Sequence, residues 1–247
     1  MIMRYFTAEL YEKMQVRGSL VFHETLEDHE EDLRWYAEQN WDYDAIARDN
    51  YLMLKPYFNR YMPKVVREAV DRGEGDLLRS SWPSPAFRSL LEGWAQSLEK
   101  EWRAACETYR EYYRTIESRL PPEKESLVRL HDAKVLQVTV TDGGSGIDLL
   151  LNTGGSMLSA NETLLRFNGV TRYYLPDDLV GNWWLYEELE LAAGGIARDG
   201  AGETGFQIRA LLSSPRGYLA MNELSITAET VDIVFTQPDE VDTFDRA

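Results

Sequence analysis

A chain of 247 residues that is 44% hydrophobic and 12% aromatic can build a sizeable core, so its composition excludes disorder of the whole chain. No apolar run approaches the roughly 20 residues that span a bilayer, and we expect no contact with a membrane. The formal net charge of −16 argues against direct binding to nucleic acid, which relies on Lys and Arg to neutralise phosphates.

Residues 1–122 have a helical pattern and are predicted to form a helical domain. The strongest signal follows Ser84 and Pro85, a good N-cap and a good first helical residue. From there apolar residues recur at steps of three and four until Pro121-Pro122, which predicts one helix of about ten turns. We expect this helix to be the spine of a bundle. Further helices are predicted over residues 7–16, 22–39, 42–61 (interrupted or bent at Pro56) and 63–71.

After residue 122 the apolar period changes from about 3.6 to 2, which is typical of strands. Short turns rich in Gly, Asp and Asn separate the strands, so the sheet should be mainly antiparallel. The sequence therefore predicts an α+β protein, a helical bundle with one long helix followed by a β-rich domain over residues 125–236. An acidic, disordered tail is expected over residues 237–247. The strands are predicted over residues 134–141, 146–152, 163–168, 182–192, 205–212, 218–228 and 231–235.

Cysteine usage and the first residues bear on location. The single cysteine, Cys106, cannot form a disulfide within the chain, and it is expected to be a small packing residue of the long helix. Residues 1–7 lack the apolar core of a signal peptide. Both features predict a protein of the reducing cytoplasm.

Acidity is concentrated in the β-rich part of the chain. Residues 1–120 contain 17 Lys and Arg against 22 Asp and Glu, whereas residues 121–247 contain 9 against 20. A field of this sign attracts a basic protein or a cationic ligand. The alternative is that the acidity serves solubility alone.

The segment Trp183–Leu191 is the most suggestive of a binding site. A regular strand would place Trp184, Tyr186, Glu188 and Glu190 on one face. Two aromatic rings beside two carboxylates suit a basic side chain, through cation–π and charge-assisted contacts. The competing interpretation is that the two rings pack beneath the helical part while the two carboxylates face water.

His131 and Asp132, at the start of the β-rich part, form a second candidate. A His beside an Asp can act as a general base if the two converge, but neighbours on a strand point apart. We therefore expect a structural His131 that bonds its own backbone or a loop carbonyl.

A third candidate is a metal site in the segment His23–His29. The two His are six residues apart, unlike the H-E-x-x-H zinc motif. Only His23 and Glu27 could jointly hold an ion, and they would need a third ligand from elsewhere. The preferred interpretation is a solvated acidic face with His29 at the edge of the core. No cofactor is expected, because the glycine-rich loops match no nucleotide-binding motif.

Three segments together carry a resemblance to a known family. They are Met3–Tyr11, which fits M-x-Y-F-T-x-E-x-Y, Leu130–Val135, and Trp183–Glu188. With them the chain resembles an uncharacterised family of Gram-positive (Bacillus-type) bacterial proteins, a domain of unknown function. The resemblance covers nearly the whole chain and implies a helical front, a β-rich back and a natural start at Met3. It implies no activity, cofactor or catalytic residue.

These observations favour a protein that binds another protein over an enzyme, since the sequence contains no complete catalytic constellation. The leading hypothesis is that the acidic β-rich half holds a basic protein partner around Trp184, Tyr186, Glu188 and Glu190. The alternatives are a metal-assisted hydrolase and a small-ligand sensor with a site between the helical and β parts. The partner and the oligomeric state are left open.

Overall fold

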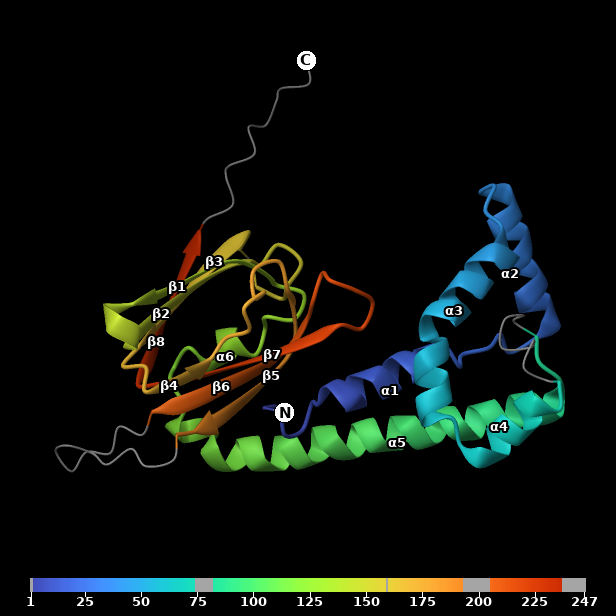
Figure 1. The fold of residues 1–247 in the computed structure, drawn as a ribbon, viewed down its shortest axis with the longest axis horizontal. Coiled ribbons are helices and arrows are strands. Elements are labelled where there is room, and N and C mark those ends of the chain that lie inside the picture. Colours follow the sequence, from blue (N-terminus) through green and yellow to red (C-terminus); the bar gives the residue numbers. More distant parts are fainter. Residues whose placement is uncertain (1, 74–81, 159, 193–204, 237–247) are drawn as a thin grey trace, which may run out of the picture. The chain divides into compact units, whose positions relative to one another are not determined.

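The computed structural model divides the chain into two compact units (Figure 1). One consists of Met1–Ala8 and Cys106–Ala247, and the other is Glu9–Ala105. The division falls inside the long helix α5 (Pro85–Ile116), whereas the sequence predicted a boundary near residue 122. The structure describes residues 2–73, 82–158, 160–192 and 205–236, so the predicted tail over residues 237–247 lies outside the described residues.

The predicted α+β order is confirmed, with helices first and an antiparallel sheet after them. The 32-residue α5 begins as predicted, since Ser84 Oγ accepts the N–H of Phe87 at 3.3 Å. α3 continues through Pro56. Within the described ranges, none of the helices is long and apolar enough to cross a membrane. The other helices are α1 (Ala8–Gly18), α2 (Leu26–Glu38), α3 (Tyr43–Tyr61), α4 (Lys64–Asp71) and α6 (Lys124–Leu127).

The core of the Glu9–Ala105 unit follows the apolar stripe of α5. Phe87, Leu91, Trp94 and Leu98 recur at steps of four and three, and all four are buried. Phe58 of α3 packs on Trp94, with ring centroids 6.0 Å apart. The pattern in the sequence therefore identified the packed face of this half of the helix.

The other unit contains one eight-stranded sheet with the order β4-β7-β6-β5-β1-β2-β3-β8. All of its strand pairs are antiparallel. The short strand β4 was not predicted, because three residues carry too little of an alternating pattern. The strands are β1 (Lys134–Thr141), β2 (Gly146–Asn152), β3 (Glu162–Asn168), β4 (Arg172–Tyr174), β5 (Trp183–Leu191), β6 (Phe206–Ser213), β7 (Met221–Ala228) and β8 (Thr230–Thr236).

The sheet curls so that its two halves face each other across one core. Phe167 of β3 and Phe206 of β6 have ring centroids 6.3 Å apart, although three strands lie between β3 and β6 in the sheet order. Leu149, Leu165 and Ile208 are fully buried in the same cluster. One face of β5, β6 and β7 packs against this core, and we call the opposite face of these strands the outer face.

One edge of β5 is covered by α5. Among the described residues, β1 pairs with β5 only at Lys134 and Trp183, and no strand neighbours the rest of that edge. Tyr109 of α5 accepts the N–H of Leu189 at 2.8 Å, and Tyr112 accepts that of Leu191. Two tyrosines one helical turn apart thus satisfy strand donors that would otherwise be open to another chain.

Candidate functional site

A β-bulge interrupts β5 in the segment that the sequence singled out. Trp184 and Tyr186 pair with consecutive residues of β6, Leu212 and Leu211, so Leu185 has no partner there. One extra residue shifts the alternation of side chains between the two faces of a strand.

The bulge turns Trp184 to the inner face, where it is fully buried and donates Nε1–H to Glu187 Oε2 at 2.9 Å. The prediction that Trp184 shares an exposed face with Tyr186, Glu188 and Glu190 is therefore wrong in two respects. Trp184 lies on the opposite face, and Glu188 and Glu190 are buried rather than exposed.

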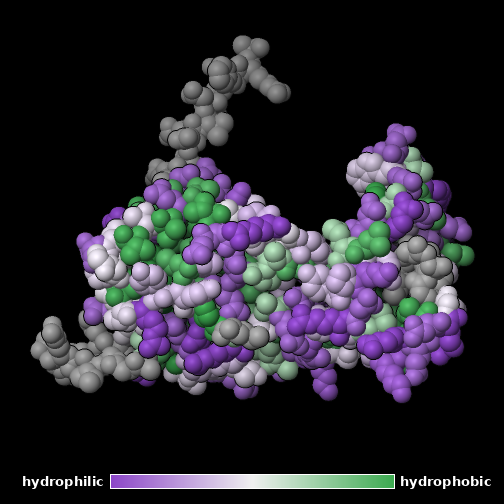
Figure 2. Space-filling model, in the orientation of Figure 1, coloured by the Kyte–Doolittle hydropathy of each residue, from purple (hydrophilic) through white to green (hydrophobic). Residues whose placement is uncertain are grey.

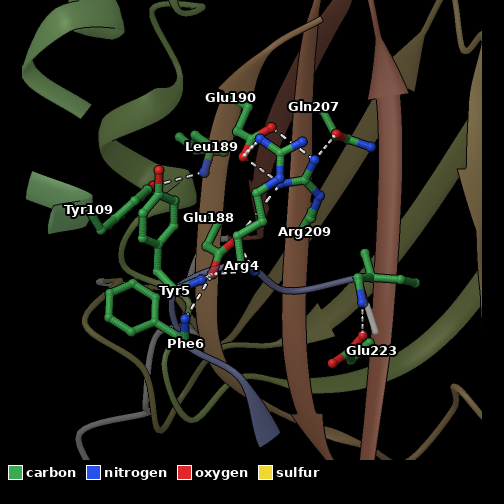
Figure 3. Close-up of polar contacts among 11 residues, drawn as sticks. Arg4, Tyr5, Phe6, Tyr109, Glu188, Leu189, Glu190, Gln207, Arg209 and Glu223 are labelled. Atoms are coloured by element: carbon green, nitrogen blue, oxygen red, sulfur yellow. Dashed lines mark hydrogen bonds and ion pairs between the residues drawn. The ribbon is translucent and has the colours of Figure 1, made fainter. Parts of the chain in front are cut away.

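The chain's own segment Ile2–Phe6 lies over the outer face of β5 beyond the bulge (Figure 3). The Glu188 carboxylate accepts the backbone N–H of Arg4 at 2.9 and 3.1 Å, that of Tyr5 at 2.6 Å and that of Phe6 at 2.8 Å. Successive backbone N–H groups that converge in this way form an anion-binding concavity. Each contact is charge-assisted, and such hydrogen bonds are stronger than neutral ones.

Two guanidinium groups surround the second carboxylate, Glu190. Arg209 of β6 holds it through both nitrogens, at 2.5 and 2.8 Å, and also donates to Gln207 at 2.6 Å. Arg4 Nη1 contacts the same carboxylate, at Oε1, at 3.0 Å. With Glu188 included, two positive and two negative side chains meet here, and this balance makes the burial of both carboxylates tolerable.

Aromatic rings line the side of the same segment. Phe6 stacks on Tyr186 with centroids 5.4 Å apart and meets Tyr109 edge-on at 5.3 Å. Tyr5 lies 5.2 Å from Tyr109 and 6.1 Å from Tyr112. The result is a surface with acceptors on its floor and aromatic rings at its side. We call it the peptide groove and define it by Tyr109, Tyr186, Glu188, Glu190 and Arg209.

His131 contacts the bulged strand. Its Nδ1 donates to the carbonyl oxygen of Leu185, the bulge residue of β5, and its ring lies 5.5 Å from that of Tyr186. Its Nε2 is 3.7 Å from Asp132 Oδ1. Asp132 turns the chain with a φ of 66°, and its N–H donates to the carbonyl oxygen of Trp184 at 2.8 Å.

The metal candidate made of His23 and Glu27 does not lie on one helix, because α2 begins at Leu26 and His23 precedes it. His23 Nε2 lies 2.6 Å from Asp32 Oδ2. Its ring is 5.2 Å from that of His29, which is buried at the edge of the core and stacked on Trp82. Among the residues that the structure describes, no three His, Cys, Asp or Glu side chains are placed to hold a metal ion.

The α2–α3 hairpin is an exposed surface that the sequence reasoning missed. In α2, Leu26 and Leu33 are exposed, and His29 is the only buried residue of this helix. Figure 2 shows hydrophobic and hydrophilic residues mixed over this part of the surface. The density of Trp and Tyr in such a polar segment was the available signal.

Four aromatic rings gather at the turn of this hairpin. Trp35 lies 5.1 Å from Tyr36 and 5.4 Å from Trp41, and Tyr36 lies 5.0 Å from Tyr43, measured between centroids. Trp35 is 47% exposed and Trp41 52%. Residues 23–49 contain ten Asp and Glu against two Arg, a formal charge of −8. We call Trp35, Tyr36, Trp41 and Tyr43 the aromatic tip.

Burial shifts the pKa of one carboxyl group in β5, that of Glu187. It raises the pKa of the Glu187 carboxyl to about 7, and the hydrogen bond from Trp184 opposes this rise only in part. Burial also raises the pKa of Tyr109, which therefore keeps its proton while it accepts the N–H of Leu189.

Residues 5–220 match the family model described as protein of unknown function (DUF4085). This match covers most of the chain and includes both the peptide groove and the hairpin. The chain belongs to this family. A comparison with curated proteins gives no match.

Proposed function

We propose that this DUF4085 protein is an interaction protein that binds a basic segment of a partner protein on its α2–α3 hairpin. The observation that carries the proposal is the exposed aromatic tip, where Trp35 and Trp41 are each about half exposed within a segment of charge −8. Large aromatic side chains that stay exposed beside one another are typical of sites that bind other molecules.

The lack of cover over α2 supports the proposal. A helix shorter than about 12–15 residues is marginal by itself and depends on packing of an apolar face. α2 has 13 residues, and of its apolar side chains Leu26, Leu33 and Trp35 are exposed. A partner that covered this face would supply the burial that the hairpin lacks.

Charge and ring chemistry favour a basic partner. Arg and Lys bind the faces of Trp and Tyr through cation–π contacts, worth about 0.5–2 kcal/mol each. The exposed carboxylates of Glu38 and Asp44 flank the tip and can pair with the same side chains. An acidic surface also repels phosphate backbones and so favours a protein partner over nucleic acid.

The partner chemistry is the one that the sequence suggested, but the surface is different, because the chain's own Ile2–Phe6 segment covers the outer face of β5. The proposal places the interaction in the bacterial cytoplasm. The single cysteine, Cys106, supports this location.

Fluorescence anisotropy of the full chain with a fluorescein-labelled amphipathic peptide of Leu, Ala and Arg tests the proposal. We expect saturable binding that weakens with salt, and no binding of the same peptide with Glu in place of Arg. The double variant Trp35→Ser, Trp41→Ser should bind at least about tenfold more weakly. Trp183→Ser is the matched control, because Trp183 is an exposed tryptophan of the other unit, and it should bind like the wild type.

Equal binding by the double variant, or no binding of the Arg peptide by the wild type, would overturn the proposal. The metal-assisted hydrolase and the small-ligand sensor would then be the hypotheses to pursue.

A further inference from the structure

The chain's own segment Ile2–Phe6 occupies the peptide groove. We infer that the groove recognises a short peptide with an Arg followed by two aromatic residues. Ile2–Phe6 fills it as an intramolecular ligand, which a peptide of the same chemistry from another molecule can replace. This inference does not rest on the proposed function, since the groove and the α2–α3 hairpin belong to different units.

The floor of the groove requires donors. Glu188 is fully buried, and its nearest charged neighbour on the sheet, Arg209 Nη1, is 3.8 Å away. Every hydrogen bond that the structure gives to the Glu188 carboxylate comes from Arg4, Tyr5 or Phe6. A buried carboxylate that loses such donors is strongly destabilising, because an uncompensated charge is left in the interior. The strand therefore carries an acceptor that is useful only when a peptide backbone lies against it.

The contacts define which peptides would fit. Three consecutive backbone N–H groups reach Glu188, so proline, which lacks an N–H, is excluded from those three positions. The side chain of the first position, Arg4, pairs with Glu190, and a carboxylate there would be repelled. The third, Phe6, lies between the rings of Tyr186 and Tyr109.

A further acceptor extends the groove toward β7. The backbone N–H of Ile2 donates to the carboxylate of Glu223, and the side chain of Met3 is buried. The segment thus contacts β5 and β7 while forming no helix or strand of its own. Figure 3 shows the acceptors spread along the sheet beneath it.

The attached segment competes with any free peptide. A ligand joined to its site by a short link has an effective concentration in the millimolar range. A free peptide therefore binds the wild type only weakly, and it binds more tightly when the attached segment is weakened. The guanidinium of Arg4 is the accessible part of the segment, with 61% of its side chain exposed, and its replacement is the mildest way to weaken the attached ligand.

The test uses the full chain and a fluorescein-labelled peptide with the sequence of residues 3–8. The wild type should bind it weakly. Arg4→Glu, which sets a carboxylate beside Glu190, and Tyr5→Pro, which removes one donor, should each raise the affinity at least about tenfold. Arg110→Glu is the charge-matched control, since Arg110 is an exposed residue of α5, and it should behave as the wild type.

Specificity is tested with a second peptide and a second substitution. The peptide with Glu in place of Arg should not bind the Arg4→Glu chain, and adding Glu188→Gln to that chain should abolish binding of the original peptide. If Glu188→Gln fails to fold by circular dichroism, Glu190→Gln takes its place. Folded Arg4→Glu protein that does not bind the peptide, or binds a scrambled peptide equally well, would overturn the inference. The substitutions at Trp35 and Trp41 should leave this binding unchanged, so the two proposals can fail independently.

Discussion

Trp184 and Glu187 lie on the same face of β5, with the indole nitrogen 2.9 Å from the carboxylate, although three positions separate them in the sequence. A regular strand would place them on opposite faces. The bulge at Leu185 brings them together on the inner side and leaves Tyr186, Glu188 and Glu190 on the outer side, beneath the N-terminal segment. The extra residue Leu185 therefore places the Trp184–Glu187 pair on the inner face of β5 and the residues of the peptide groove on its outer face.

Glu187→Gln should change how stability depends on pH. The pKa of Glu187 is about 7 in the folded state against an ordinary value of 4.5, so between these values the folded state binds more protons than the unfolded state. The free energy of unfolding that this group contributes is therefore present at low pH and lost as pH rises toward 7 and above. Gln keeps an acceptor for Trp184 and carries no charge.

Urea denaturation of both proteins at about pH 5 and about pH 8 checks this. The variant should be more stable than the wild type at the higher pH by on the order of 1–2 kcal/mol, and close to it at the lower pH. A difference that does not vary with pH would show that the carboxyl titrates normally.

Substitution of alanine for glycine should change the free energy of unfolding in opposite directions at Gly205 and Gly93. A Cβ at Gly205 would lie 2.7 Å from the carbonyl oxygen of Ala228, whereas a Cβ at Gly93 of α5 would meet nothing within 4 Å. Gly205→Ala should therefore lower the free energy of unfolding by about 1–3 kcal/mol. Gly93→Ala should raise it by about 0.5–1 kcal/mol, because alanine has the higher helix propensity. Thermal melting followed by circular dichroism measures both, and a shift in the same direction would contradict this account.

Tyr109→Phe should expose the free edge of β5. The substitution keeps the ring but leaves the N–H of Leu189 without its acceptor, at a cost of about 1–3 kcal/mol. Amide hydrogen exchange should show faster exchange at Leu189. The control is Tyr113→Phe, because the ring of Tyr113 lies beside that of Tyr109 in the same helix. This substitution should change the free energy of unfolding by less than about 0.5 kcal/mol. Unchanged exchange at Leu189 would mean that the strand edge does not depend on Tyr109.

The aromatic tip should contribute little to the stability of the free protein. Trp35→Ala or Trp41→Ala should change the free energy of unfolding by less than about 1 kcal/mol, because both side chains are about half exposed. Leu91→Ala, at a fully buried position of α5, should cost about 2–5 kcal/mol. Chemical denaturation of the three variants compares them. Tryptophan variants as damaging as Leu91→Ala would mean that the tip belongs to the protein's own core and is no docking surface.

The sequence by itself determined the local features of this protein. The stripe from Phe87 to Ile116 predicted α5, and the change of period after residue 122 predicted the sheet, because periodicity reflects which side of an element is apolar. The sequence also suggested an acidic, aromatic face of Trp184, Tyr186, Glu188 and Glu190 suited to a basic side chain, and three of these four residues share the outer face of β5. Each of these properties depends on residues close together in the chain.

Only the tertiary structure decided what covers each face. The bulge at Leu185 depends on register with β6, and the burial of Glu188 depends on Arg4, which is 184 residues away in the sequence. The same limit explains α2, where the spacing of Leu26 and Leu33 correctly predicted a helix but not that its apolar face is left exposed. Periodicity records which face of an element is apolar, while burial depends on long-range packing that no local pattern contains.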